Sequence, residues 1–184
     1  FDIRVFRPRG LRRFIRPQIL FEIDGMRPFE PQPAENAFPV YEWGLNWCIA
    51  TSAHRYMMLH AGTIAFGDSA MILPGTPGSG KSTLSAALSL RGARLLSDEF
   101  GLLRPESIEL LPMPRGIPLK NASIEAIIEF DAAAPLGPTY PETRKGRVRH
   151  LRPDAGSLAR QAEPARPRWL VFPRYQAGAP ETLV

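Results

Sequence analysis

The chain has 184 residues, of which 44% are hydrophobic and 22% charged, which suits one globular domain with an appendage. No apolar run approaches the ~20 residues that a membrane-spanning helix needs. The formal net charge is +5, and the arginines fall in two clusters. No zinc-finger spacing or aromatic ribonucleoprotein pattern accompanies them, which argues against nucleic acid as the main partner. The single Cys48 excludes an internal disulfide and favours a reducing compartment, so we expect a cytoplasmic protein.

The N-terminal part of the chain predicts a β-rich appendage followed by a helix. Residues 1–7 begin with alternating apolar side chains, and residues 19–23 form a second candidate strand. The pair Asp24-Gly25 after it is a strong hairpin turn signal. A proline-rich connector then leads to residues 39–56, which we interpret as a helix that packs the appendage onto the rest of the chain.

The remaining residues predict strands interrupted by two helices, with turn signals at Gly67-Asp68 and Gly92. We expect an alternating strand over 56–66, a strand over 70–73, a helix over 82–90 and a strand over 94–97. A hairpin over 100–103 and 108–111 should follow, and then a helix over 121–130 capped by Asn121. After a loop over 131–146, we expect two last strands over 148–151 and 169–172. We therefore divide the chain into an appendage over 1–54 and a core over 55–184.

The most specific motif is a phosphate-binding loop of the form G-x-x-x-x-G-K-[ST]. Its residues, with the one that follows, are Gly75, Thr76, Pro77, Gly78, Ser79, Gly80, Lys81, Ser82 and Thr83. The glycines let successive backbone N–H groups point at phosphate oxygens, Lys81 adds a positive charge, and Ser82 offers a hydroxyl to Mg²⁺. An apolar strand precedes the loop and a helix follows it, so the helix N-terminus faces the phosphates. The motif predicts a site for ATP and Mg²⁺.

Two further features make this nucleotide site a candidate catalytic site. Asp98-Glu99 ends the strand after the helix, where carboxylates can hold Mg²⁺ and one can deprotonate an attacking hydroxyl. An exposed acidic turn is the alternative. His60 precedes the loop hairpin and could relay a proton, although a lone histidine is more often structural.

These segments together resemble the catalytic core of bacterial HPr serine kinase/phosphorylase. The resemblance covers residues 56–105 and rests on Leu59-His60-Ala61-Gly62, on the phosphate loop, and on the stretch from Arg91-Gly92 to Asp98-Glu99. The whole chain is more similar still to the HPr-kinase-related "kinase A" branch, found beside exosortase and peptide-modification genes. That likeness is carried by residues 38–48, 114–121 and 171–175.

The resemblance implies a fold, an activity and residue roles. The fold would be an α/β core of the HPr-kinase and phosphoenolpyruvate-carboxykinase type, with a mixed β-sheet and flanking helices. The activity would be transfer of phosphate from ATP to a serine-type hydroxyl of a protein or peptide, and related hexamers imply a homo-oligomer. Asp98 would be the catalytic base, assisted by His60 and Lys81. Ser82, Asp98 and Glu99 would hold the metal.

The sequence also departs from the true HPr kinases. Glu99 replaces a second Asp, Ala61 replaces a Gly, and the C-terminal HPr-contacting signature is absent. A peptide acceptor is therefore favoured over HPr itself. Two alternatives remain: a non-catalytic or slowly hydrolysing ATP-binding regulator, and an interaction module with a vestigial loop. The candidates for additional charge at the site are Arg115, Lys120, Arg144 and Lys145.

Overall fold

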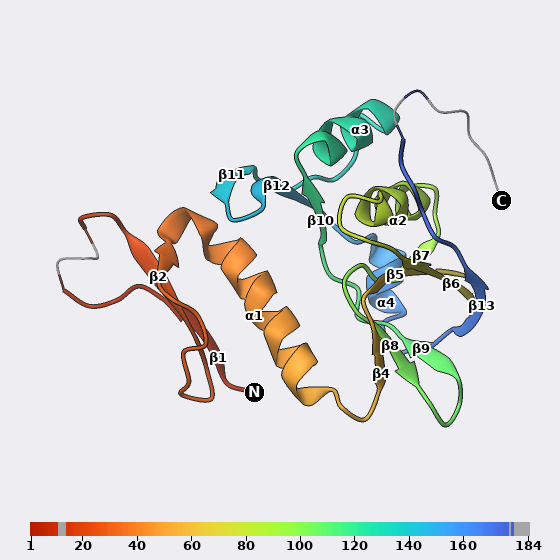
Figure 1. The fold of residues 1–184 in the computed structure, drawn as a ribbon, viewed down its shortest axis with the longest axis horizontal. Helices are drawn as coiled ribbons and strands as arrows, with labels where there is room; N and C mark the ends of the chain where they lie inside the picture. The colour runs from red at the N-terminus through yellow and green to blue at the C-terminus, as the bar shows by residue number, and fades with distance from the viewer. Residues whose placement is uncertain (11–13, 177, 179–184) are drawn as a thin grey trace. The chain divides into compact units, whose positions relative to one another are not determined.

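A computed structural model describes residues 1–10, 14–176 and 178 of the chain (Figure 1). In these residues the fold is mixed α/β, with four small sheets and four α-helices. The chain divides into two compact units, of which unit 1 comprises 1–54 and 139–148 and unit 2 comprises 55–138 and 149–184. The first division falls at the boundary expected from the sequence. The segment 139–148, which the sequence analysis assigned to the core, belongs to unit 1.

Unit 1 consists of a three-stranded antiparallel sheet, a long helix and a hairpin. Its elements are β1 (Ile3–Phe6), β2 (Gln18–Ile23), β3 (Gln32–Pro33), the 3-10 helix η2 (Ala34–Asn36), α1 (Ala37–Ser52), β11 (Tyr140–Thr143) and the start of β12 (Gly146–Leu151). The strand β2 lies between β1 and β3, and its buried residues alternate along the strand. The sequence therefore located β1, β2 and the helix, although α1 ends four residues before the predicted end.

The helix α1 packs closely on the sheet of unit 1 at a glycine. A Cβ on Gly44 would lie 1.9 Å from Cε2 of Phe21, so only glycine allows this approach. The small core beneath the helix also includes Ile19, Ile23 and Val40. The tight turn at Asp24-Gly25 is present as well, with both residues at positive φ, which matches the predicted hairpin turn.

The centre of unit 2 is a four-stranded sheet in the order β13-β6-β5-β7. Its strands are β5 (Ala61–Phe66), β6 (Ser69–Pro74), β7 (Arg94–Ser97) and β13 (Arg166–Leu170). The other elements of the unit are β4 (Met57–Leu59), α2 (Lys81–Leu90), β8 (Gly101–Arg104), β9 (Glu109–Leu111), β10 (Ile117–Lys120), α3 (Ala122–Phe130), the end of β12, and α4 (Ala155–Ala159).

Both faces of this central sheet are buried. One face packs against α2, which in turn contacts α3 and β10, and Ile64, Leu73 and Leu95 belong to the core on this side. The other face is covered with the help of β8 and β9, and Ala65 and Leu96 lie on that side. This burial is confined to β5, β6 and β7 and explains why those strands are largely apolar, whereas the edge strand β13 is mostly exposed.

Three sequence predictions are corrected by the structure. The expected strand over 56–66 is two strands, β4 and β5, which separate at His60 and join different sheets. The expected loop over 131–146 contains β11, a short and mostly exposed strand whose Pro141 obscured the alternation. Asn121 occupies the N-cap position of α3, but its side chain makes no capping hydrogen bond. The short helix α4 was not predicted.

Candidate functional site

Strand directions bring the separate sequence motifs to one edge of the central sheet. β5 is antiparallel to both β6 and β7, so β6 and β7 end where β5 begins. Ala61 pairs with Pro74, and Thr63 pairs with Ser97. His60, the phosphate loop and Asp98 each follow directly beyond these paired positions. Carboxyl ends of strands are where ligands bind in open α/β sheets.

The phosphate loop connects β6 to α2 and has the backbone that its glycines predict. Gly78 and Gly80 adopt φ of 84° and 97°, a region that residues with a Cβ rarely enter. A Cβ on Gly75 would lie 2.6 Å from Oγ of Ser79, so this position also requires glycine. Helix α2 begins at Lys81, and its first N–H groups face the loop as expected for anion binding.

The ammonium of Lys81 binds backbone carbonyls at the start of the phosphate loop. Its Nζ donates to the carbonyl of Gly75 at 2.6 Å and to that of Thr76 at 3.3 Å. Ligand phosphate oxygens would compete for the same ammonium. The C-terminal segment also reaches the loop, because the N–H of Tyr175 donates to the carbonyl of Ser79 at 3.1 Å.

Asp98 is the most unusual group of the site. Only 8% of the residue is exposed, and neither carboxylate oxygen makes a hydrogen bond of ordinary geometry. Burial raises the pKa of Asp98 to about 6, while the nearby hydroxyls of Ser82 and Ser85 and the charge of Lys120 act in the opposite direction. The two serines are thus close enough to influence the pKa without completing a hydrogen bond. A buried carboxylate without a partner is costly, and such groups cluster at functional sites.

Glu99 and His60 face each other beside Asp98. Nε2 of His60 lies 3.6 Å from Oε2 of Glu99, and the histidine side chain is 62% exposed. The imidazole also lies against Phe100, with ring centroids 6.3 Å apart. The negative charge of Glu99 contributes to the raised pKa of Asp98. The structure therefore brings Asp98, Glu99 and His60 together.

Two further residues, His150 and Gly62, complete the site, and no sequence motif identified either of them as a site residue. His150 on β12 is buried, and burial together with the charge of Lys120 lowers its pKa to about 4, so its imidazole is neutral near pH 7. Gly62 on β5 faces helix α2 closely. A Cβ at this position would lie 2.4 Å from Oγ of Ser85 and 3.5 Å from Oδ1 of Asp98, so a larger side chain would crowd the site. The position of Gly62 two residues after His60 was the only available signal, and His150 had none.

The residues present fit a divalent cation held jointly with nucleotide phosphates. The orphaned oxygens of Asp98 lie near the Ser82 hydroxyl, which supplies the oxygen ligands that Mg²⁺ prefers. The carboxylate of Glu99 acts electrostatically on Asp98, but the side chain that it contacts is that of His60. Within the described ranges, no three His, Cys, Asp or Glu side chains gather into a metal cluster. In phosphate-loop enzymes the phosphates provide further ligands.

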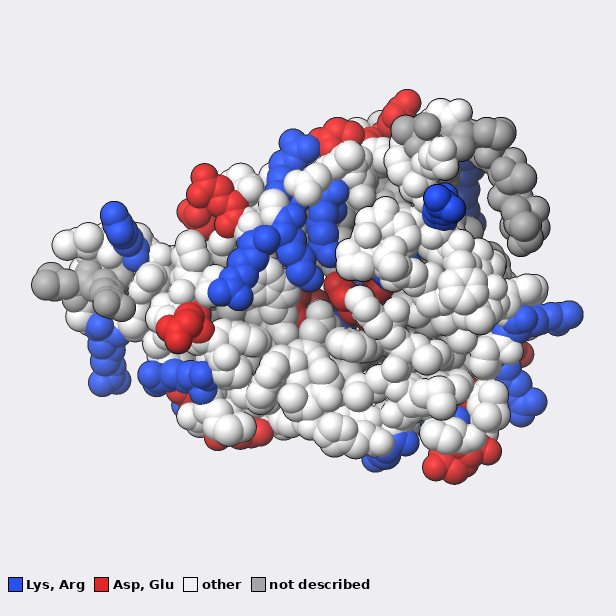
Figure 2. Space-filling view, viewed as in Figure 1, with Lys and Arg blue, Asp and Glu red and all other residues white. Residues whose placement is uncertain are grey.

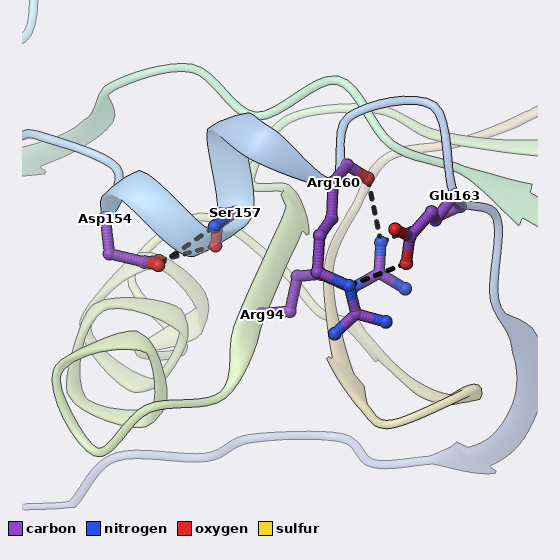
Figure 3. Close-up of polar contacts among 5 residues, drawn as sticks. All are labelled: Arg94, Asp154, Ser157, Arg160 and Glu163. Carbon is purple, nitrogen blue, oxygen red and sulfur yellow. Dashed lines mark hydrogen bonds and ion pairs between the residues drawn. The ribbon is translucent and has the colours of Figure 1, made fainter.

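A network of polar contacts anchors β7, the strand that directly precedes Asp98 (Figure 3). The guanidinium of Arg94, at the start of β7, donates to the carbonyls of Arg160 at 3.3 Å and Glu163 at 2.6 Å. The N–H of Leu95 donates to Oγ of Ser157 at 2.9 Å. These hydrogen bonds hold β7 against α4 and the turn that follows it, and they therefore help to fix the position of Asp98, which follows the strand.

Of the four candidate cations, Lys120 lies at the site, Arg115 is half-buried in the segment between β9 and β10, and the other two lie in unit 1. Lys120 is close enough to act on Asp98 and on His150. Arg144 and Lys145 lie in unit 1, at the tip of the hairpin formed by β11 and β12.

In the described residues, no helix is long and apolar enough to cross a membrane. Comparison of the chain with protein-family models, with curated proteins and with solved structures returns no match.

Proposed function

We propose that this protein is a phosphotransferase that moves the terminal phosphate of ATP, with Mg²⁺, to a serine-type hydroxyl of a protein or peptide. The observation that carries the proposal is the buried carboxylate of Asp98, which has no hydrogen-bond partner and lies beside Ser82 of the phosphate loop. The pKa of about 6 leaves this group ionised near neutral pH and still able to accept a proton. The fold would be the HPr-kinase-like core and the compartment the cytoplasm.

The chain's own groups divide the work in this proposal. The loop N–H groups and the N-terminus of α2 bind the phosphates, and Lys81 leaves the carbonyl of Gly75 to contact them. Mg²⁺, when bound, neutralises phosphate charge and orients the outer phosphates. Asp98 accepts the proton of the acceptor hydroxyl as the new O–P bond forms and the bond to the leaving diphosphate breaks. Lys120 supplies positive charge beside the reacting groups.

His60 has a positioning role in this scheme. Its imidazole is more exposed than Asp98 and contacts Glu99 at 3.6 Å, so it orients that carboxylate and does not itself take the acceptor's proton. Removing the imidazole of His60 should therefore lower the rate of phosphate transfer less than removing the carboxylate of Asp98. Since His150 is neutral and buried, we assign it no proton transfer.

The proposal is tested with γ-labelled ATP, Mg²⁺ and polypeptides encoded near this chain's gene. Label should appear on one acceptor, and Asp98→Asn should cut transfer by about two to four orders of magnitude while nucleotide binding persists. His60→Ala should have a smaller effect. Lys81→Ala should remove most of the increase in melting temperature that ATP with Mg²⁺ produces.

The outcomes separate the proposal from its alternative. Unchanged transfer in Asp98→Asn would refute the role of the base. If ATP stabilises the wild type but label never leaves the nucleotide, or leaves only slowly as inorganic phosphate, the protein is an ATP-binding regulator.

A further inference from the structure

Unit 1 contains a pocket that the phosphotransfer site does not use. It has a volume of about 500 Å³, within the range of ligand-binding pockets. The lining residues of this pocket are Pro28, Phe29, Glu30, Gln32, Val40, Trp43, Trp47, Arg144 and Lys145. All of them belong to unit 1. Aromatic rings and cations thus meet in one hollow.

The aromatic wall of the pocket comes from one face of α1. Val40, Trp43 and Trp47 are spaced three and four residues apart, which places them on the same side of the helix. Val40 is buried in the core of the unit, whereas both tryptophans are only partly buried. Phe29 from the segment after β2 adds a third ring. The rings therefore serve both the core and the pocket.

The cationic wall comes from the tight turn between β11 and β12, and it is held in place. Thr143 pairs with Gly146 across the turn, and its hydroxyl donates to the carbonyl of Gly146 at 2.7 Å. The N–H of Lys145 donates to that hydroxyl oxygen at 3.1 Å. A turn closed in this way presents both cations at low entropic cost.

Further contacts attach this hairpin to the rest of unit 1. The amide of Asn36 donates to the carbonyl of Glu142 at 3.0 Å, and the rings of Phe38 and Tyr140 stack at 6.3 Å. Figure 2 shows Lys and Arg side chains gathered on the surface in the region of β11 and β12. Among the described residues, neither Arg144 nor Lys145 forms an ion pair. Both are exposed, so their charge is available to a ligand.

We propose that this pocket docks a segment of the polypeptide acceptor in which an acidic side chain neighbours an aromatic or large apolar one. The carboxylate would meet Arg144 and Lys145, and the apolar side chain would lie against Trp43 and Trp47. Glu30 in the lining disfavours a phosphodiester chain, which presents negative charge along its whole length. Docking on a separate unit supplies acceptor affinity away from the reacting groups. This inference rests on the proposed function for the identity of the acceptor.

The test uses the full chain with Trp169→Phe, so that the two pocket tryptophans are the only fluorescent ones of the three in the chain. The probes are a capped peptide Gly-Ser-Asp-Phe-Gly-Ser, its counterpart with Lys in place of Asp, and an oligothymidylate. Titrations contain no nucleotide. The Asp-Phe peptide should change the tryptophan emission saturably, and the Lys-Phe peptide should not.

Charge reversal decides which residues are responsible. Arg144→Glu with Lys145→Glu should weaken binding of the Asp-Phe peptide by about tenfold to a hundredfold, the range expected for lost charge-assisted contacts. Arg7→Glu with Arg9→Glu makes the same change in net charge on exposed residues of unit 1 outside the pocket, and it should leave affinity within about twofold.

Three results would overturn the docking proposal: no saturable response to the Asp-Phe peptide, equal loss of affinity in both charge-reversal variants, or tighter binding of the oligothymidylate than of the peptide. Because no nucleotide is present, such a failure leaves the ATP stabilisation and its loss in Lys81→Ala intact. Failure of the phosphotransfer proposal appears instead as missing label transfer with peptide binding unchanged.

Discussion

Replacing Asp98 by asparagine should stabilise the protein without ligand. Burial is the main cause that raises the pKa of Asp98 from 3.8 to about 6, so ionising this group in the folded state is unfavourable by about two pK units. At ~1.4 kcal/mol per unit, the folded state loses up to about 3 kcal/mol of stability once the carboxylate is ionised. Asparagine has a similar shape and no charge, so the variant avoids this loss.

The sign of the pH dependence follows from linkage. Below the unfolded-state pKa the carboxyl group is protonated in both states and costs nothing. As pH rises toward the folded-state pKa of about 6, the unfolded chain releases its proton first, and the folded wild type loses stability. Asp98→Asn should therefore exceed the wild type in free energy of unfolding at about pH 8 and match it at about pH 3, below the unfolded-state pKa of 3.8.

The assay is urea unfolding followed by far-ultraviolet circular dichroism at both pH values, with Asp68→Asn as the control on an exposed aspartate. The control should change stability by less than about 0.5 kcal/mol. If Asp98→Asn were no more stable than the wild type at about pH 8, the carboxylate would not be held in an unfavourable environment. Asp98 would then not mark a functional site by its burial.

Three further predictions concern packing and pH. Gly62→Ala should cost about 1–3 kcal/mol, because the new Cβ would lie 2.4 Å from Oγ of Ser85, and combining it with Ser85→Ala should restore most of the loss in a double-mutant cycle. Ser157→Ala should cost about 1–3 kcal/mol in urea unfolding, because the buried N–H of Leu95 loses its acceptor; a neutral result would contradict the role of this contact. Phosphotransfer should fall as pH drops, because Asp98 acts as a base only when ionised; the midpoint should lie at or below about 6, since bound Mg²⁺ lowers the pKa of a nearby carboxylate, and transfer that persists when Asp98 is protonated would exclude it as the base.

Local signals in the sequence determined the elements of the phosphate site. The glycines at 78 and 80 and the apolar run before them predicted a strand, a glycine-dependent loop and a helix after it, and the structure has each of these, with both glycines at positive φ. These features depend on residues close together in the chain, so short-range backbone preferences are sufficient to specify them. The turn at Asp24-Gly25 is specified in the same way.

Only the tertiary structure decided which distant groups meet and in what environment. The antiparallel placement of β5 between β6 and β7 brings His60 and Asp98 to the loop, and no local pattern encodes strand order. Likewise, the sequence shows an ordinary histidine at 150, and only the fold reveals that burial beside Lys120 lowers its pKa to about 4. Arg144 appeared to be part of a loop in the core, yet the hairpin places it in a pocket of unit 1. Burial, charge environment and cavity shape all arise from contacts between residues far apart in the chain, which is why the sequence could name the chemical groups but not their surroundings.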